Sequence, residues 1–208
     1  MSAPRPTAPE AATPESDAPE AAIPEADGLD VGQNRAARKY TRKEMALRVL
    51  WMAGKYLVRW SPRPAFGWRR FVLRAFGATV GPHVHVYNST RIYMPWNLTV
   101  GAWAAIGEDV LVYNLGPVTI GERATVSHQA HLCAGTHDYR KPDLPLLKPP
   151  ITIGPQAWVC ADAFVGPGVT VGEGAIVGAR AVALRDVEPW MIVSGNPAAP
   201  VKERRLDV

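Results

Sequence analysis

A dipeptide of valine or isoleucine followed by glycine recurs along this 208-residue chain, in places six or twelve residues apart. This spacing matches neither the 3.6-residue period of a helix nor the two-residue period of a strand. A six-residue period is the signature of a parallel β-helix, in which three hexads close one triangular coil. From residue 80 onward, eight such dipeptides occur: Val80-Gly81, Val100-Gly101, Ile106-Gly107, Ile120-Gly121, Ile153-Gly154, Val165-Gly166, Val171-Gly172 and Val177-Gly178.

The hexads fall into five groups of three. Fourteen of the fifteen lead residues are Val, Ile or Leu, and only Ala183 departs. Coils begin at Val80, Val100 and Ile120, and the next begins at Ile153 because residues 138–150 are inserted. Stacked lead side chains would bury a continuous core. The sequence therefore predicts an all-β parallel β-helix over residues 77–187 with an inserted loop at 138–150. A β-sandwich, the alternative, would show alternation with period two.

Two segments of opposite charge precede the repeats. Residues 1–34 carry seven acidic side chains against Arg5, a net charge of −6, with repeated Ala and Pro. This composition predicts a disordered tail, and the tail has no apolar stretch typical of a secretory signal. Residues 35–76 are predicted to be a basic helical segment, with an amphipathic helix that ends before Pro62. Residues 188–208 are expected to form a C-terminal segment near the cofactor.

Two roles are open to the basic helix. It is too short and too charged to span a bilayer. The favoured role is to cover the open edge of the first coil. The second is to lie, through residues 35–74, on an anionic membrane surface. Nucleic-acid binding is not expected, because no base-reading motif accompanies the charge. Cys133 and Cys160 are expected to lie on different faces of the coil and to stay reduced. We therefore expect a cytoplasmic protein, peripheral at the inner face of the membrane.

Function is expected where the repeat is broken. The third coil ends in Gly135-Thr136-His137-Asp138, at the root of the inserted loop. A neutral imidazole can take a proton from a hydroxyl group near neutral pH, which makes His137 a candidate general base. Its other ring nitrogen then needs a partner, for which the Asp138 carboxylate and a backbone carbonyl are both candidates.

Several motifs resemble one family, the hexapeptide-repeat O-acetyltransferases, which includes galactoside, maltose and nodulation acetyltransferases. The matching motifs are the hexads, Thr136-His137 with its loop, residues 151–159, residues 167–172 and residues 194–198. Residues 113–121, 133–138, 161–165 and 189–190 are most similar to the acetyltransferases of colanic-acid biosynthesis. The resemblance covers about residues 71–201. It implies a left-handed coil, homotrimers with active sites between subunits, and acetyl-CoA as the acetyl donor.

The resemblance also implies residue roles. His137 would be the general base in a direct, metal-free transfer of acetyl to a sugar hydroxyl of an exopolysaccharide or a lipid-linked glycan. The implied cofactor-binding positions are Trp158, Ala161, Ala179, Leu184, Arg185, Lys202 and Arg204. The candidate substrate-binding residues are Tyr113, Asn114 and Asp138. Gly107 and Leu115 stand where galactoside acetyltransferases have a sugar-binding Asn and Asp, so that pair is not carried over.

Two alternative functions remain at this point, and a third does not fit the histidine spacing. An N-acetyltransferase acting on an amino-sugar nucleotide would keep the fold and the donor. A non-catalytic β-helix scaffold would not bind CoA. A γ-type carbonic anhydrase shares the fold but needs two zinc-binding histidines four residues apart. His128, His131 and His137 are spaced by three and by six residues, so the carbonic anhydrase pattern is not met.

Overall fold

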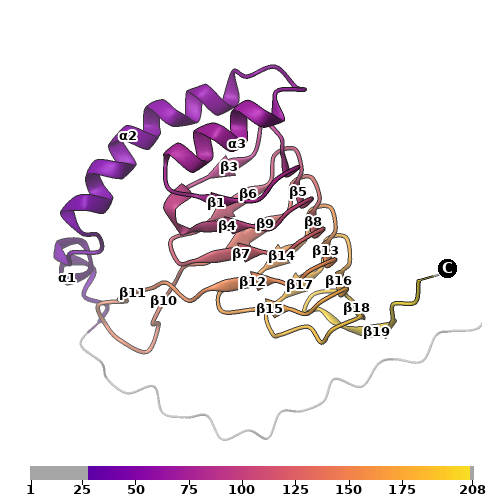
Figure 1. Cartoon of the computed structure of the whole chain (residues 1–208). Coiled ribbons are helices and arrows are strands. Elements are labelled where there is room, and N and C mark those ends of the chain that lie inside the picture. The colour runs from indigo at the N-terminus through magenta and orange to yellow at the C-terminus, as the bar shows by residue number, and fades with distance from the viewer. Residues whose placement is uncertain (1–27, 207–208) are drawn as a thin grey trace, which may run out of the picture.

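The computed structural model describes residues 28–206, which form a stack of β-strand coils with helices over its N-terminal end (Figure 1). The helices are α1 (Val31–Ala36), α2 (Arg42–Arg59) and α3 (Phe66–Ala75), and a short 3-10 helix, η1 (Pro95–Asn97), follows the first coil. Helix α2 starts at a capping box, in which Thr41 and Glu44 exchange hydrogen bonds between side chain and backbone. It ends ahead of Pro62, as the sequence predicts.

The coils have three flat faces, each a parallel sheet. Face A is built of β1 (Thr79–Val80), β4 (Leu98–Val100), β7 (Val118–Ile120), β12 (Ile151–Ile153) and β15 (Thr170–Val171). Face B is built of β2 (His85–Val86), β5 (Ala105–Ile106), β8 (Thr125–Val126), β13 (Trp158–Val159), β16 (Ile176–Val177) and β18 (Met191–Ser194), with β19 (Ala199–Glu203) antiparallel to β18. Face C is built of β3 (Arg91–Ile92), β6 (Leu111–Tyr113), β9 (His131–Cys133), β14 (Phe164–Val165) and β17 (Val182–Ala183).

The predicted hexad register is confirmed. Val80 pairs with Val100, and Ile120 pairs directly with Ile153 across the insertion. All the lead residues are buried inside the coil. The predicted parallel β-helix is therefore the observed fold, and its core is the continuous stack of lead side chains.

The glycine of the repeat is explained by the close stacking of coils. A Cβ atom on Gly121 would lie 2.5 Å from the backbone nitrogen of Pro155 in the next coil. The turns place the residue three positions after a lead in the left-handed region, with φ of 56° at His83 and 57° at Arg123. This conformation is uncommon for residues other than glycine. It recurs at the same position in most coils.

The coil stack continues past the predicted boundary at residue 187. Val187 bridges to Val171, and Val193 pairs with Val177; both side chains are buried. Residues 191–194 are therefore part of the stack as β18, and the predicted separation of 188–208 from the β-helix is wrong there. Val187 comes four positions after Ala183 instead of six, so the six-residue period is lost in the sequence at this corner.

The helices cover the open edge of the first coil, as favoured from the sequence. In the stack, the carbonyl of a lead residue accepts from the preceding coil, as Val100 does from the backbone nitrogen of Gly81. The lead carbonyls of the first coil therefore have no strand partner. The side chains of Arg74, Arg69 and Trp51 donate to the carbonyl oxygens of Val80, Val86 and Ile92, one on each face. Side-chain donors from helices α2 and α3 thus replace a missing coil.

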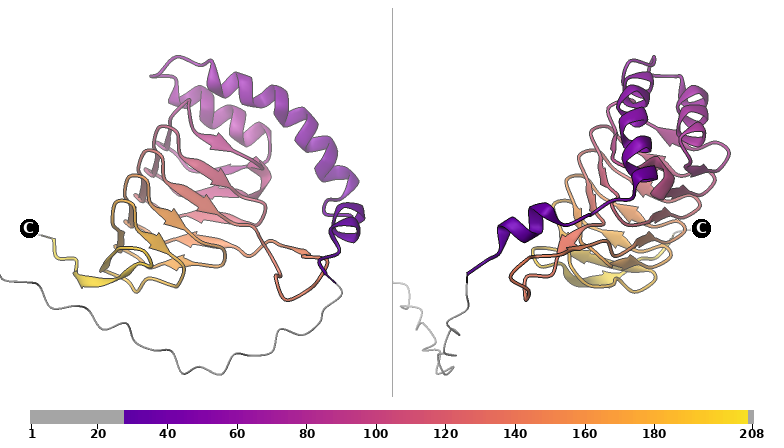
Figure 2. Two further views of the ribbon diagram at one scale, coloured as in Figure 1. Left: turned by 180° about the vertical axis from the view of Figure 1, so that it is seen from behind. Right: turned by 90° about the vertical axis from the view of Figure 1, so that its left-hand side faces the viewer.

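The inserted loop contacts the N-terminal helical segment (Figure 2). Strands β10 (Thr136–His137) and β11 (Leu146–Leu147) pair antiparallel at its root. The backbone nitrogen of Asp30 donates to Pro142, and helix α1 begins at Val31. The predicted disordered tail reached residue 34, so its last residues are wrongly assigned; contacts with the loop supply the partners that composition alone does not show. The rest of the predicted tail, residues 1–27, lies outside the described residues.

No helix between residues 28 and 206 has the length and apolar character required to cross a membrane.

Candidate functional site

His137 lies at the end of β10, and its side chain is solvent-exposed at the corner between faces C and A. The antiparallel pairing of β10 with β11 brings the loop back over the ring, with His137 opposite Leu146. Its Nδ1 lies 2.5 Å from the carbonyl oxygen of Leu144. A carbonyl oxygen can only accept, so Nδ1 carries the proton and, in a neutral ring, Nε2 keeps its lone pair.

The carbonyl oxygen of Leu144 has a second donor. The Nδ2 of Asn34 lies 2.6 Å from it and 2.6 Å from the carbonyl oxygen of Asp143. Lys39 in turn donates to Oδ1 of Asn34. Helix α1, through Asn34, therefore holds the part of the loop that orients His137, a connection across 110 residues of sequence. Sequence reasoning missed Asn34, and no local pattern marks it.

Asp138 does not orient the imidazole. Its carboxylate accepts hydrogen bonds from the side chain and the backbone N–H of Arg140. These hydrogen bonds hold the pKa of Asp138 below its usual value. Of the two partners considered for His137, the structure selects the backbone carbonyl.

The two candidate substrate residues on β6 and beyond it differ in accessibility. Asn114 is fully buried, accepts from the backbone of Tyr93 and Met94, and donates to the Met94 carbonyl. The predicted sugar contact of Asn114 is therefore wrong, because its amide pins the turn before η1. Tyr113 is half-buried and packs edge-on against Tyr93, with 4.7 Å between ring centroids. Burial raises the pKa of Tyr113.

Trp158 and the C-terminal cations meet in a groove of about 630 Å³ on face B. Register places Trp158, Ile176, Ile192 and Lys202 side by side on four successive strands. The Trp158 indole is 44% exposed, and its Nε1 donates to Ser127 at 2.8 Å. The groove thus has an apolar floor with a cation at one end.

Arg204 lines the same groove, but its guanidinium is engaged. Nη1 donates to the carbonyl oxygens of Gln156 and Gly174, both at 2.9 Å. Arg204 therefore attaches the C-terminal strand to the coils. Arg205 also lines the groove.

The remaining predicted cofactor positions lie at corners. Ala161 and Ala179 stand on adjacent coils between faces B and C, where the Arg180 backbone donates to the Ala161 carbonyl. Leu184 and Arg185 are exposed at the corner that follows β17. They do not line the groove that holds Trp158.

His137 and the Trp158 groove lie on different sides of one coil stack. His137 stands at the corner after face C, and Trp158 stands on face B. A single chain therefore does not bring the two together.

Cys133 on face C and Cys160 after β13 are both free and lie on different faces, as predicted. Burial raises the pKa of each thiol, which disfavours the reactive thiolate. Within residues 28–206, no group of three or more His, Cys, Asp or Glu side chains is arranged to hold a metal ion.

No protein-family model matches the sequence. Over 158 residues the chain is 39% identical to the colanic acid biosynthesis acetyltransferase WcaF of Escherichia coli (strain K12), a match that covers 76% of this chain and 87% of that protein. Two solved structures superpose with TM-scores of 0.73. They are a maltose O-acetyltransferase from Clostridium difficile 630, at 20% identity, and a hexapeptide-repeat acetyltransferase complexed with acetyl-CoA from Vibrio cholerae, at 22%.

These two superpositions cover 80% of this chain and 90% of the maltose enzyme, and 81% of this chain and 92% of the Vibrio enzyme. A coil of opposite hand would not superpose along such a length. The chain therefore has the hand of those folds, which the sequence resemblance gives as left-handed.

Proposed function

The chain belongs to the hexapeptide-repeat acetyltransferases and is an acyltransferase, and on that premise we propose that it transfers acetyl from acetyl-CoA to a sugar hydroxyl. The acceptor is a glycan of exopolysaccharide biosynthesis. Support for this acceptor class comes from the relative of 39% identity, which is named for colanic acid biosynthesis.

One observation carries the proposed chemistry: the Leu144 carbonyl holds Nδ1 of His137, which leaves Nε2 free. In the proposed reaction Nε2 takes the proton of the acceptor hydroxyl while its oxygen attacks the thioester carbonyl. The carbon–sulfur bond then breaks, and the imidazolium returns the proton to the CoA sulfur. Transfer is direct in a ternary complex. Cys133, whose thiol is half-buried with a raised pKa, is not used as an acyl carrier.

We assign the donor to the groove on face B. A flat apolar floor of Trp158, Ile176 and Ile192 suits the pantetheine arm, and Lys202 and Arg205 suit the phosphates. The Vibrio cholerae structure of the same fold is a complex with acetyl-CoA. The assignment needs no metal.

The same proposal calls for more than one chain. His137 and the Trp158 groove lie on different sides of the stack, so a neighbouring subunit has to supply one of them. We propose a homotrimer, in which three such junctions close one ring.

We also propose that residues 35–74 contact an anionic membrane surface. Helices α2 and α3 and the residue that caps α2 expose large apolar side chains among the cations, including Trp60, the cap residue, at 81% exposure and Phe71 at 61%. Such a mixture suits the boundary between lipid headgroups and acyl chains. We expect the protein to co-sediment with anionic vesicles, and we expect this binding to weaken as the salt concentration rises. Equal binding to neutral vesicles would contradict the proposal.

The decisive experiment is a thiol-release assay with acetyl-CoA and a panel of hydroxyl and amino acceptors. We expect transfer to a sugar hydroxyl, and we expect His137→Ala to lose about 10²–10⁴-fold in turnover while CoA affinity stays the same. Near-normal turnover of His137→Ala would sink the assignment of the base. The control is Asp138→Asn, which removes a carboxylate that does not contact the ring.

A further inference from the structure

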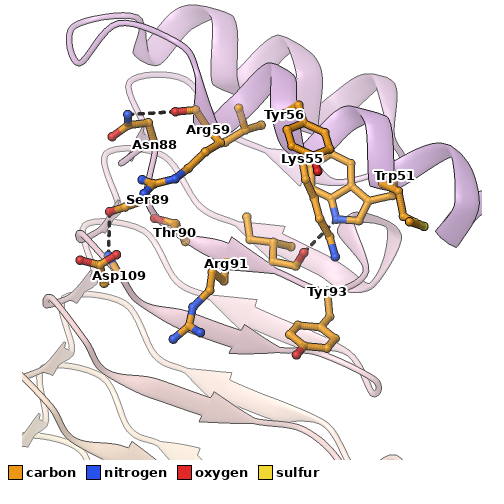
Figure 3. Close-up of a pocket in the computed structure, with 13 residues that line it drawn as sticks. Trp51, Lys55, Tyr56, Arg59, Asn88, Ser89, Thr90, Arg91, Tyr93 and Asp109 are labelled. Atoms are coloured by element: carbon orange, nitrogen blue, oxygen red, sulfur yellow. Dashed lines mark hydrogen bonds between the residues drawn. The ribbon is translucent and has the colours of Figure 1, made fainter.

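A groove of about 650 Å³ lies between helix α2 and the first coil. The helix contributes Lys55 and Arg59, and the coil contributes Ser89, Arg91 and Tyr93. Figure 3 shows Arg59 extending from the helix toward Ser89, and Lys55 pointing toward Tyr93 from the same helix. The groove is distinct from the donor groove on face B.

The cations of this groove have no carboxylate partner. Within residues 28–206, the side chains of Lys55, Arg59 and Arg91 form no ion pair at 4.0 Å or less. Asp109 is the single acidic residue among those that line the groove. Burial, helped by Arg48, lowers the pKa of Lys55. All three residues are exposed, and they surround one hollow. An anion in the groove would offset the mutual repulsion of these like charges.

The groove also has an apolar side that runs onto the outer surface of the helices. Trp51, Met52 and Tyr56 line it. A second, shallower hollow beside it is formed by Tyr56, Leu57, Trp60 and Trp68. An anion with an apolar extension fits this combination better than a small inorganic ion does.

Aromatic side chains lead from this groove toward His137. Tyr93 stands above Tyr113 in adjacent coils, with 4.7 Å between ring centroids. A Cβ atom built on Gly135 would lie 3.2 Å from the Tyr113 ring, and Gly135 is two residues before His137. Neighbouring strands lie ~4.8 Å apart, so the path from Tyr93 to the level of β9 is about 10 Å long. That length suits one or two sugar rings.

We propose that the groove under α2 binds the diphosphate of a glycosyl diphosphate acceptor, and that Tyr93 and Tyr113 line the path of its sugar to His137. This inference rests on the proposed function and names its substrate class. Arginine forks suit phosphate oxygens, and the aromatic rings present apolar faces to the sugar. The apolar hollow beside the groove favours a prenyl diphosphate over a nucleoside diphosphate as the source.

Calorimetric titration of the full-length protein, with CoA saturating the donor groove, tests the site without turnover. The probes are farnesyl diphosphate, a nucleoside diphosphate sugar and inorganic pyrophosphate. Arg59→Gln and Arg91→Gln should each raise the Kd of the bound diphosphate about 10-fold to 100-fold, since each removes a charge-assisted hydrogen bond. Arg123→Gln, at an exposed corner outside the groove, should leave it unchanged.

Binding of farnesyl diphosphate that depends on Arg59 and Arg91 supports the lipid source, and equal dependence for the nucleotide sugar supports the nucleotide source. No binding by any probe, or binding that is insensitive to both substitutions in variants with wild-type melting curves, overturns the inference. A different result would overturn the proposed function: CoA binds, but no acceptor in the panel is acetylated. Efficient transfer to a phosphate-free sugar, unaffected by Arg59→Gln, would keep the function and remove the diphosphate site.

Discussion

Asn34 and His137 share one hydrogen-bond acceptor, the carbonyl oxygen of Leu144. The donor atom of Asn34 lies 2.6 Å from that oxygen and Nδ1 of His137 lies 2.5 Å from it. The carbonyl fixes the tautomer of the imidazole, and Asn34 fixes the carbonyl. A residue of helix α1 thus acts on the proposed base through Leu144 of the inserted loop.

Asn34→Ala is expected to lower kcat by about 10-fold to 100-fold, because a small displacement of a catalytic group has effects of that size. The KM for acetyl-CoA should stay unchanged, since Asn34 does not line the donor groove. Steady-state kinetics on the full chain provides the measurement. Gln33→Ala, on the adjacent exposed position, is the matched control and should behave as wild type. Equal kinetics for the two variants would refute a positioning role.

Arg69→Ala is expected to destabilise the fold strongly. The side chain is fully buried and donates to the carbonyl oxygens of Val86, Pro62 and Arg63, and to Ser61. Each buried acceptor left without a donor costs roughly 1–3 kcal/mol. Urea unfolding measures the loss of free energy. Arg70→Ala removes one bond, to Val84, and should cost much less; similar losses for both variants would contradict the role given to Arg69.

Two glycine-to-alanine substitutions should change the free energy of unfolding in opposite directions. Gly121→Ala places a methyl group 2.5 Å from the Pro155 backbone nitrogen, so we expect a loss of about 1–3 kcal/mol from overpacking. In Gly67→Ala the nearest atom is the flexible end of Arg70, 3.7 Å away, and the position is helical. Alanine should stabilise there by up to about 1 kcal/mol. Thermal melting of both variants tests the close stacking of coils, which a stable Gly121→Ala would rule out.

His131 should make the protein less stable in mild acid. Burial, together with the charge of Arg91, lowers the pKa of His131, and its Nε2 is buried without a hydrogen-bond partner. The unfolded chain therefore binds the proton first, and stability falls as the pH drops below the unfolded value of about 6.5. Above that pH the folded state carries no penalty.

The measurement is the melting temperature from pH 8 to pH 5. His131→Leu places at this position the residue type that stands at position 111 in the adjacent coil. The variant should lose less stability on acidification than wild type. Parallel curves for the two proteins would show that His131 is not the titrating group.

The sequence determines the coil and the place where it is broken. Each lead residue faces the interior at a spacing set by the chain itself, and the glycine that follows is required by contact with the next coil. His137 could be singled out in the same way, because the insertion after it changes the spacing of the coils from 20 to 33 residues. The last coil was not predicted from the sequence, because the corner between Ala183 and Val187 is two residues shorter than the six-residue period requires.

Contacts between distant segments were decided only by the tertiary structure. Asn114 carries the same amide whether it faces a sugar or a buried turn, and only the packed backbone of Met94 shows which one applies. Helix α2 crosses from the inserted loop to the open edge of the stack (Figure 1). Because of this path, Asn34 donates a hydrogen bond to Leu144, and Arg59 lines a groove with residues of the first coil. A repeat is a local property that hydrophobic spacing encodes directly. The partners of a polar side chain depend on which segments the completed fold brings within hydrogen-bond distance.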